Sequence, residues 1–153
     1  MEYPWKMTWD ARAYLAASMA GTCCRVIDIG GGLGTIKRVM NPQEYVSIDL
    51  EKWTDDTVVA DLNITFPELQ SCDCIMCLGV LEYISDSDLF LTSLHQYGAK
   101  MVMSYRRFSK GGMDRANEYT FDEVRALLER NGWEIIRTEM LHANEQIYLV
   151  EEK

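Results

Sequence analysis

Short apolar runs rich in β-branched residues recur along the chain, and several of them are apolar at successive positions. This pattern is typical of strands that are buried on both faces, as in a parallel sheet covered by helices. The runs lie at residues 25–29, 45–48, 57–60, 72–78 and 100–104. Helical patterns separate several of these runs, so the sequence predicts an α/β fold whose first strands are parallel.

The helical patterns are clearest at residues 87–96 and 120–131, where apolar residues recur at the spacing of a helix face. The second segment begins with Thr120-x-x-Glu123, the pattern of a capping box, in which each residue bonds the other's backbone N–H. It closes with an Asn-Gly pair, which is typical of a helix C-terminus. We therefore expect a helix over each segment.

The two ends of the chain add a helix and a hairpin. Thr8 and Asp10 are candidate N-caps of an Ala-rich helix, and Gly21 is its expected end. Two strand-like runs, 133–140 and 146–150, are separated by only about five residues. So short a connection is too short for a parallel crossover, and it predicts an antiparallel hairpin that completes the sheet.

Composition is that of one globular domain: 153 residues, 48% hydrophobic and 25% charged. No repeat or linker interrupts the chain, so we expect a single domain over 1–153, with a helical cap at 1–21 and an α/β core at 22–153. No stretch approaches the roughly 18 apolar residues of a membrane span. No basic segment precedes the apolar patch at 16–20, so we expect a cytoplasmic protein with no membrane partner.

Charge narrows the expected partners further. The chain carries 15 Lys and Arg against 24 Asp and Glu, a formal net charge of −9. A phosphate backbone would be repelled by most faces of such a protein, so nucleic acid is not an expected partner.

Five cysteines occur as Cys23-Cys24 and Cys72-x-Cys74-x-x-Cys77. The second group has the spacing of a metal site, but it falls in a predicted buried strand. Strand side chains alternate, which places Cys72 and Cys74 on one face and Cys77 on the other. We therefore interpret the cysteines as small core residues and expect no metal ion.

The strongest functional signal is VIDIGGGLGT at residues 26–35, a strand that ends in a glycine-rich turn and leads into a short helix. Glycines allow a sharp turn and let a ligand approach the backbone closely. A dinucleotide fingerprint, G-x-G-x-x-G, fails here because Thr35 stands at its third glycine when the frame starts at Gly30. The pattern that does fit is Asp-x-Gly-x-Gly-x-Gly, at Asp28, Gly30, Gly32 and Gly34.

This pattern resembles motif I of the class I S-adenosylmethionine (SAM)-dependent methyltransferases. CDCIMCLGVLEYISD, at 72–86, resembles the fourth-strand block of that family, with Tyr83 in place of a frequent His. EYTFDEVRALLERNGWEIIRTEML, at 118–141, resembles its late helix and strand. The resemblance covers about residues 25–150. It implies a Rossmann-like, doubly wound sheet of about seven strands in the order 3-2-1-4-5-7-6, with SAM as cofactor.

The resemblance also implies roles for individual residues. Asp28, Gly30 and Gly32 would surround the methionine part of SAM, and Asp49, which lies 21 residues after Asp28, would accept hydrogen bonds from the ribose hydroxyls. The adenine edge of SAM would contact Asp61 and Leu62. The sulfonium would lie beside Cys77 and Leu78.

The chain departs from the family in being short. Only about seven residues, 51–57, separate the second and third strands, too few for the usual crossover helix. The connection from the third strand to the fourth is also short, and the acceptor-binding insertions of many relatives are absent. The sequence predicts a minimal member of the family.

Candidates for the acceptor site follow the later strands. Glu82 and His142 are candidate general bases, whereas Tyr83, Arg106 and Arg107 are candidate acceptor contacts. Each also has an ordinary explanation: a helix cap, an exposed turn or a solvated loop. Lys110 would extend the basic spot at 106–107, which suits a carboxylate or phosphate on the acceptor. Trp5 and Trp9 either cover the site or pack the first helix on the sheet.

The predicted function is therefore methyl transfer from SAM to a small molecule or a flexible group. A SAM-binding domain without catalysis, acting as a sensor or assembly partner, is the alternative that the missing insertions leave open. A nicotinamide-dependent oxidoreductase is a third hypothesis, which the failed dinucleotide frame disfavours.

Overall fold

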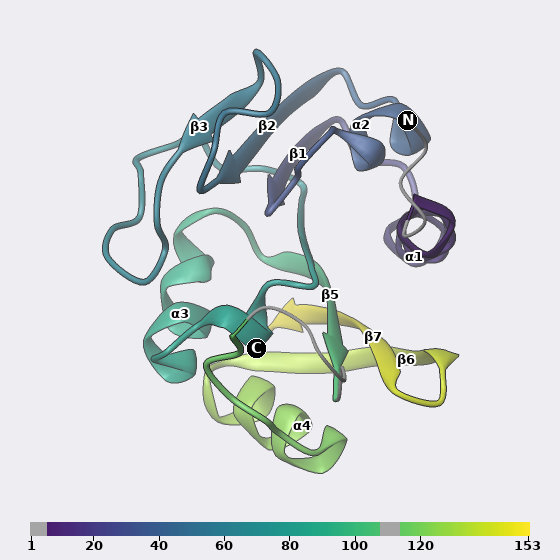
Figure 1. Cartoon of the computed structure of the whole chain (residues 1–153), viewed down its shortest axis with the longest axis vertical. Helices are drawn as coiled ribbons and strands as arrows, with labels where there is room; N and C mark the ends of the chain where they lie inside the picture. The colour runs from purple at the N-terminus through teal and green to yellow at the C-terminus, as the bar shows by residue number, and fades with distance from the viewer. Residues whose placement is uncertain (1–5, 108–113) are drawn as a thin grey trace.

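The computed structural model describes residues 6–107 and 114–153. Within these residues one seven-stranded sheet has the order β3-β2-β1-β4-β5-β7-β6, which confirms the order implied by the resemblance (Figure 1). The strands are β1 (Arg25–Ile29), β2 (Glu44–Asp49), β3 (Thr57–Val59), β4 (Cys74–Leu78), β5 (Lys100–Arg106), β6 (Trp133–His142) and β7 (Glu145–Glu152).

The first five strands are parallel, and β7 pairs antiparallel with both β5 and β6. The predicted hairpin is therefore confirmed, but its strands are longer than expected, since only residues 143 and 144 connect them. His142, expected in a turn, is the last residue of β6 and pairs with Glu145 across the hairpin.

Helices cover both faces of the sheet, as expected for a doubly wound fold. On one face α1 (Lys6–Ala20) and α2 (Thr35–Met40) pack against the core cluster that contains Val26 and Met76. On the other, α3 (Ser87–Ser93) and α4 (Phe121–Arg130) pack against the cluster that contains Ile27, Ile75 and Trp133. Two short 3₁₀ helices complete the set, η1 (Leu81–Tyr83) and η2 (Leu94–Gln96).

Helix ends follow the local signals in part. The capping box of α4 is confirmed, with the Thr120 hydroxyl accepting from the Glu123 N–H and the Glu123 carboxylate accepting from the Thr120 N–H. Gly21 ends α1 with a φ of 72°, a left-handed conformation that favours glycine. The predicted N-caps of α1 are wrong, because the helix begins by Lys6 and Thr8 and Asp10 lie inside it.

The cysteine prediction also needs correction. Cys74 and Cys77 do face opposite sides of the sheet, in the α1 and α3 clusters respectively. Cys72, however, packs with the Cys77 cluster, because β4 begins only at Cys74 and alternation does not extend back to residue 72. Three thiolates on one face are therefore not available from this segment.

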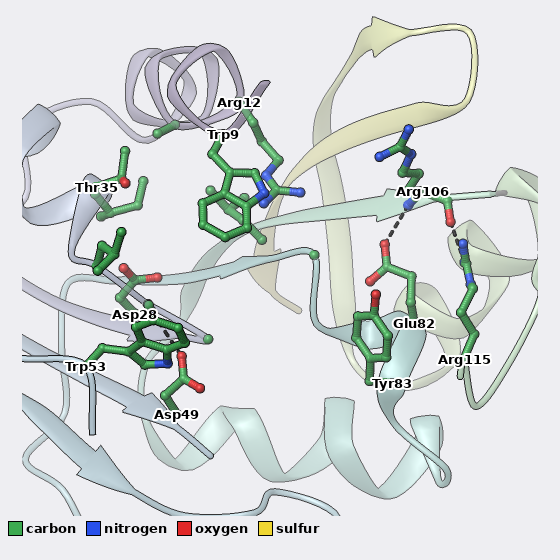
Figure 2. Close-up of a pocket in the computed structure, with 18 residues that line it drawn as sticks. Trp9, Arg12, Asp28, Thr35, Asp49, Trp53, Glu82, Tyr83, Arg106 and Arg115 are labelled. Carbon is green, nitrogen blue, oxygen red and sulfur yellow. Dashed lines mark hydrogen bonds between the residues drawn. The ribbon is translucent and has the colours of Figure 1, made fainter. Parts of the chain in front are cut away.

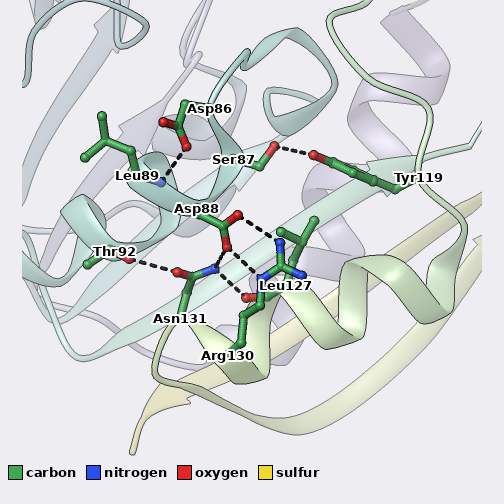
Figure 3. Close-up of polar contacts among 9 residues, drawn as sticks. All are labelled: Asp86, Ser87, Asp88, Leu89, Thr92, Tyr119, Leu127, Arg130 and Asn131. Carbon is green, nitrogen blue, oxygen red and sulfur yellow. Dashed lines mark hydrogen bonds and ion pairs between the residues drawn. The ribbon is translucent and has the colours of Figure 1, made fainter.

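A polar clip joins the two helices on the second face (Figure 3). The Asp88 carboxylate accepts from Nε and Nη2 of Arg130 at 2.7 and 2.8 Å, and from Nδ2 of Asn131 at 2.7 Å. The hydrogen bonds from Arg130 hold the pKa of Asp88 at about 2, below its ordinary value of 3.8. Nearby, the Tyr119 hydroxyl donates to the Ser87 hydroxyl at 3.0 Å, and the Thr92 hydroxyl donates to Oδ1 of Asn131.

No helix connects β2 to β3 or β3 to β4, as the short connections predicted. This edge of the sheet consequently has no helix from these connections to cover it, and Val59 on β3 and Ile64 beyond it are exposed. Among the described helices none is long and apolar enough to cross a membrane.

Candidate functional site

A cavity of about 320 Å³ lies at the carboxyl ends of β1, β2, β4 and β5, beneath the start of α1 (Figure 2). This is where ligands bind in open α/β sheets, at the point where the strand order reverses on either side of β1 and β4. The lining residues are Trp9, Arg12, Ala13, Asp28, Gly30, Gly31, Gly32, Leu33, Thr35, Ile36, Asp49, Trp53, Leu78, Gly79, Glu82, Tyr83, Arg106 and Arg115.

The glycine turn after β1 forms one wall of the cavity. Gly31 packs against β2, where a Cβ would lie 2.6 Å from Cβ of Ser47, so no larger residue fits without movement. Gly32 is different: it has a φ of 49°, and a Cβ there would meet nothing within 4 Å. The chain therefore needs glycine at 31 to close the turn on the sheet, whereas at 32 the missing side chain leaves open space that a ligand can use.

Asp49 ties the end of β2 to this turn. Its Oδ2 accepts from the Gly32 N–H at 3.0 Å, and its Oδ1 accepts from the Leu50 N–H at 2.7 Å. Each carboxylate oxygen has a further lone pair, so the group can still accept from hydroxyls in the cavity. Two exposed apolar side chains, those of Leu33 and Trp53, line the same cavity.

Asp28 lies deeper, at 3% exposure, and its Oδ2 accepts from the Tyr45 hydroxyl at 2.6 Å. Burial disfavours the charged form and raises the pKa of Asp28 from 3.8 to about 7, with the negative charge of Asp49 acting in the same direction. The hydrogen bond from Tyr45 and the charge of Arg12 oppose the shift without cancelling it. A nearby cation would restore the ionised form.

Glu82 stands at the opposite end of the cavity, on η1 directly after β4. It is 3% exposed; Oε1 accepts from the Arg106 N–H at 2.6 Å, while Oε2 is buried without a hydrogen-bond partner among the described residues. Burial raises the pKa of Glu82 above its ordinary value, against the Arg106 N–H and the charges of Arg115 and Arg12. A buried carboxylate with a raised pKa and one unpartnered oxygen is a candidate for proton transfer.

Arg12 reaches the cavity from α1 and is held by a buried carboxylate. Its Nη1 donates to Oε1 of Glu145 at 3.0 Å, and Glu145 has no exposed surface. The second oxygen of Glu145 lies 3.2 Å from Nε2 of His142, and Nδ1 of His142 accepts from the Asn144 N–H. Arg12 also covers Gly79, where a Cβ would be 2.8 Å from Nη1.

Two more arginines complete this end of the cavity. Arg115 donates from Nη2 to the Arg106 carbonyl, and its guanidinium lies over the Tyr105 ring at 5.5 Å. Arg106 itself lines the cavity. Arg107 points elsewhere, with its guanidinium 5.4 Å from the centre of the Phe121 ring.

The structure thus brings together most of the residues named from the sequence. Those that line the cavity are Asp28, Gly30, Gly32, Asp49, Leu78, Glu82, Tyr83 and Arg106, together with Trp9. Gly34, Asp61, Leu62, Cys77, Arg107 and His142 lie outside its lining. Trp5 and Lys110 fall outside the described residues.

Local contacts and burial explain why several of the predicted residues do not line the cavity. Asp61 accepts from the Asn63 N–H in its own turn, and Leu62 packs in the core. Cys77 is fully buried inside the sheet, which raises the pKa of its thiol. The contacts implied for Asp61, Leu62 and Cys77 stay predictions.

Arg12, Arg115 and Glu145 were not predicted. The only signal for Arg12 is that it lies three residues after Trp9 and so shares a helix face with it. Neither Arg115 nor Glu145 stands in any motif. No group of three or more His, Cys, Asp or Glu side chains in the described segments could hold a metal ion.

No protein-family model matches the chain, and no curated protein does. Solved structures do match it. The pyocyanin biosynthetic protein PhzM superposes with a TM-score of 0.74 over 97% of this chain and 56% of its own, at 18% identity. A SAM-dependent methyltransferase from Mesorhizobium loti superposes with a TM-score of 0.74 over 93% of this chain and 98% of its own, at 16% identity.

Magnesium protoporphyrin IX methyltransferase ChlM from Synechocystis PCC 6803, solved with bound SAM, gives a TM-score of 0.69 at 18% identity. The match covers 96% of this chain and 79% of ChlM, whereas the chain spans little more than half the length of PhzM. The chain therefore has the class I SAM-dependent methyltransferase fold, as its motifs predicted.

Proposed function

We propose that the protein binds SAM in this cavity and catalyses methyl transfer to a small molecule or a flexible group. The observation that carries the proposal is the wall formed by the open Gly32 turn and the Asp49 carboxylate at adjacent strand ends. ChlM, which shares the fold, was solved with SAM bound. The net charge of −9 supports a small acceptor rather than a nucleic acid.

The residues present fit the cofactor. Open space at Gly32 admits a ligand against the backbone, and the Asp49 carboxylate has lone pairs left for ribose hydroxyls. Asp28, with its raised pKa, would ionise next to the ammonium group of SAM and pair with it. Leu33 and Trp53 offer apolar surface in the same cavity for the adenine base.

SAM supplies a methyl group on a sulfonium, together with its leaving group, so the protein has mainly to orient the acceptor and exclude water. Leu78, the last residue of β4, and Gly79 also line the cavity. Arg12 covers Gly79 from α1, and Trp9 lies beside Arg12 on the same helix (Figure 2). An acceptor held beside Glu82 would lie next to Gly79 and Arg12.

Of the two candidate bases, Glu82 is the one that lines the cavity. We propose that its unpartnered Oε2 takes the proton of an acceptor hydroxyl. His142 contacts Glu145 instead, and we propose that it acts as a positioning residue, through Glu145 and Arg12.

Calorimetric titration with SAM tests the binding proposal. Asp49→Ala removes hydrogen bonds to a charged acceptor and is expected to weaken SAM binding by roughly 2–4 kcal/mol. Asp55→Ala, at an exposed carboxylate in the connection between β2 and β3, is the control and should bind normally. Because Asp49 also holds the turn, thermal denaturation must show that the variant is folded. Unchanged SAM affinity in Asp49→Ala would remove the ribose assignment.

Turnover separates catalysis from binding alone. With a panel of hydroxyl-bearing small molecules we expect S-adenosylhomocysteine to form, and Glu82→Gln to lower kcat by about 10²–10⁴. SAM binding without any product would instead favour a sensor or assembly domain. Quenching or enhancement of nicotinamide fluorescence on titration would favour the oxidoreductase.

A further inference from the structure

We propose that the acceptor carries an oxyanion, a carboxylate or a phosphate, which binds among Arg12, Arg106 and Arg115 beside Glu82. We call these three arginines the arginine cluster. The inference rests on the proposed function, because the cluster lines the same cavity, but it concerns a different end of it and a different ligand.

Each residue of the arginine cluster comes from a separate part of the chain. Arg12 extends from α1 over the end of β4, Arg106 ends β5, and Arg115 lies in the segment that leads to α4 (Figure 2). Guanidinium groups can bind carboxylate or phosphate through two parallel hydrogen bonds. All three arginines line the same cavity, which offers an anion three possible partners there.

The charges at this end of the cavity do not cancel. Glu145 pairs with Arg12, and Glu82 is the other carboxylate in the group. Three cations against these two carboxylates leave one positive charge at this end, while Asp28 and Asp49, the other carboxylates of the lining, lie at the glycine-turn end of the cavity (Figure 2). In a chain with a net charge of −9, this local excess of positive charge favours an anionic ligand.

Two buried polar atoms at this end of the cavity lack a hydrogen-bond partner among the described residues, which indicates that a ligand binds here. Oε2 of Glu82 is buried and has no partner among the described residues, on a residue that is only 3% exposed. Nε of Arg115 is likewise buried without a partner there. A ligand with a hydroxyl next to an oxyanion would satisfy both, the hydroxyl at Glu82 and the oxyanion at Arg115.

Two of the three arginines are already held in place. Arg12 is fixed by the fully buried Glu145, and Arg115 by the Arg106 carbonyl and the Tyr105 ring. The guanidinium of Arg106 makes no ion pair with any described residue, so it remains available. Binding therefore needs little ordering of Arg12 and Arg115, which favours affinity.

Benzoate, phenyl phosphate and benzamide are suitable probes, because the aromatic side chains of Trp9 and Tyr83 line the cavity and can pack on a ring. Benzamide keeps the shape of benzoate without its charge. Calorimetric titrations should be run on the full chain, both free and saturated with S-adenosylhomocysteine. We expect benzoate or phenyl phosphate to bind at least about tenfold more tightly than benzamide, and their ranking identifies the preferred oxyanion.

Arg106→Gln and Arg115→Gln should each abolish this preference and leave SAM affinity unchanged. Arg106 is exposed, so its variant is expected to fold even if Arg115→Gln does not. Arg137→Gln is the control, since Arg137 pairs with Glu139 on β6 and does not line the cavity. Equal binding of all three probes, or loss of SAM affinity in Arg106→Gln, would overturn the inference.

The proposed function can fail separately. If the protein does not bind SAM but still prefers benzoate or phenyl phosphate through Arg106, then the oxyanion site stands and the methyl-transfer proposal falls. If SAM binds and the probes show no preference, only the oxyanion inference is lost.

Discussion

Replacing Asp28 by asparagine is expected to remove a loss of stability that grows with pH. In the folded protein Asp28 is buried and its pKa is about 7, against 3.8 for the free side chain. Between these values the unfolded chain is ionised while the folded chain is still protonated. The folded state binds more protons over this range, so its stability falls as pH rises.

The size of the effect follows from the shift. Below about pH 4 Asp28 is protonated in both states and contributes no difference. Above that, stability is lost at about 1.4 kcal/mol per pH unit, until the folded-state pKa is passed near pH 7. The shift of roughly three units corresponds to about 4 kcal/mol, reached near neutral pH and constant above it.

Urea denaturation at a series of pH values measures the free energy of unfolding of the wild type and of Asp28→Asn. The difference between the two proteins gives the contribution of Asp28. The amide in Asp28→Asn keeps the shape of the carboxyl group and can still accept from the Tyr45 hydroxyl, but it does not ionise. Glu82, whose pKa is also raised, titrates in both proteins and cancels in the difference. Asp55→Asn, at an exposed site, is the control.

We expect Asp28→Asn to match the wild type near about pH 4 and to exceed its stability increasingly up to about pH 7. The difference for Asp55→Asn should not follow this course. A difference for Asp28→Asn that is the same at both ends of the range would show that Asp28 is not protonated in the folded state. The reasoning from burial would then be wrong.

Three further changes test packing and helix ends. Gly31→Ala should destabilise the protein by about 1–3 kcal/mol in thermal or urea denaturation, because its Cβ would meet Ser47 at 2.6 Å; an unchanged midpoint would contradict this. Thr120→Ala removes a helix cap and should cost about 1 kcal/mol by the same measurement, whereas no loss would mean the cap contributes nothing. Asp88→Asn breaks an exposed ion pair with Arg130 and should cost under about 1 kcal/mol, less at high salt; a larger, salt-independent loss would refute that estimate.

The wall of the cavity formed by Asp28, the glycine turn and Asp49, here called the Asp49 wall, could be predicted because its residues lie at the ends of buried strands. Asp28 and the glycines end β1, and Asp49 ends β2, its parallel neighbour. The carboxyl ends of neighbouring parallel strands share one edge of a sheet, so local pattern and topology together bring these residues close. The same argument predicted Glu82 beyond the end of β4 and Arg106 near the end of β5, where it is the last residue of the strand.

The covering side of the cavity could not be predicted in the same way. Where Arg12 points depends on how α1 packs across the sheet, and its partner Glu145 is 133 residues away in the chain. His142 was expected in a turn, because strand patterns end where side chains become exposed rather than where pairing ends. Hairpin length is set by backbone pairing, which apolar patterns mark poorly at an edge strand.

The pair between Arg12 and Glu145 has a consequence for the order in which the protein is made. A ribosome completes α1, the glycine turn and the first five strands before it adds β7, which carries Glu145. Until then Arg12 has no buried carboxylate to hold it over Gly79, and the ends of β4 and β5 lack this cover. The Asp49 wall joins residues close in sequence and can form early on the nascent chain. The arginine cluster is complete only once β7 has been made and has paired with β5, because Arg12 depends on Glu145.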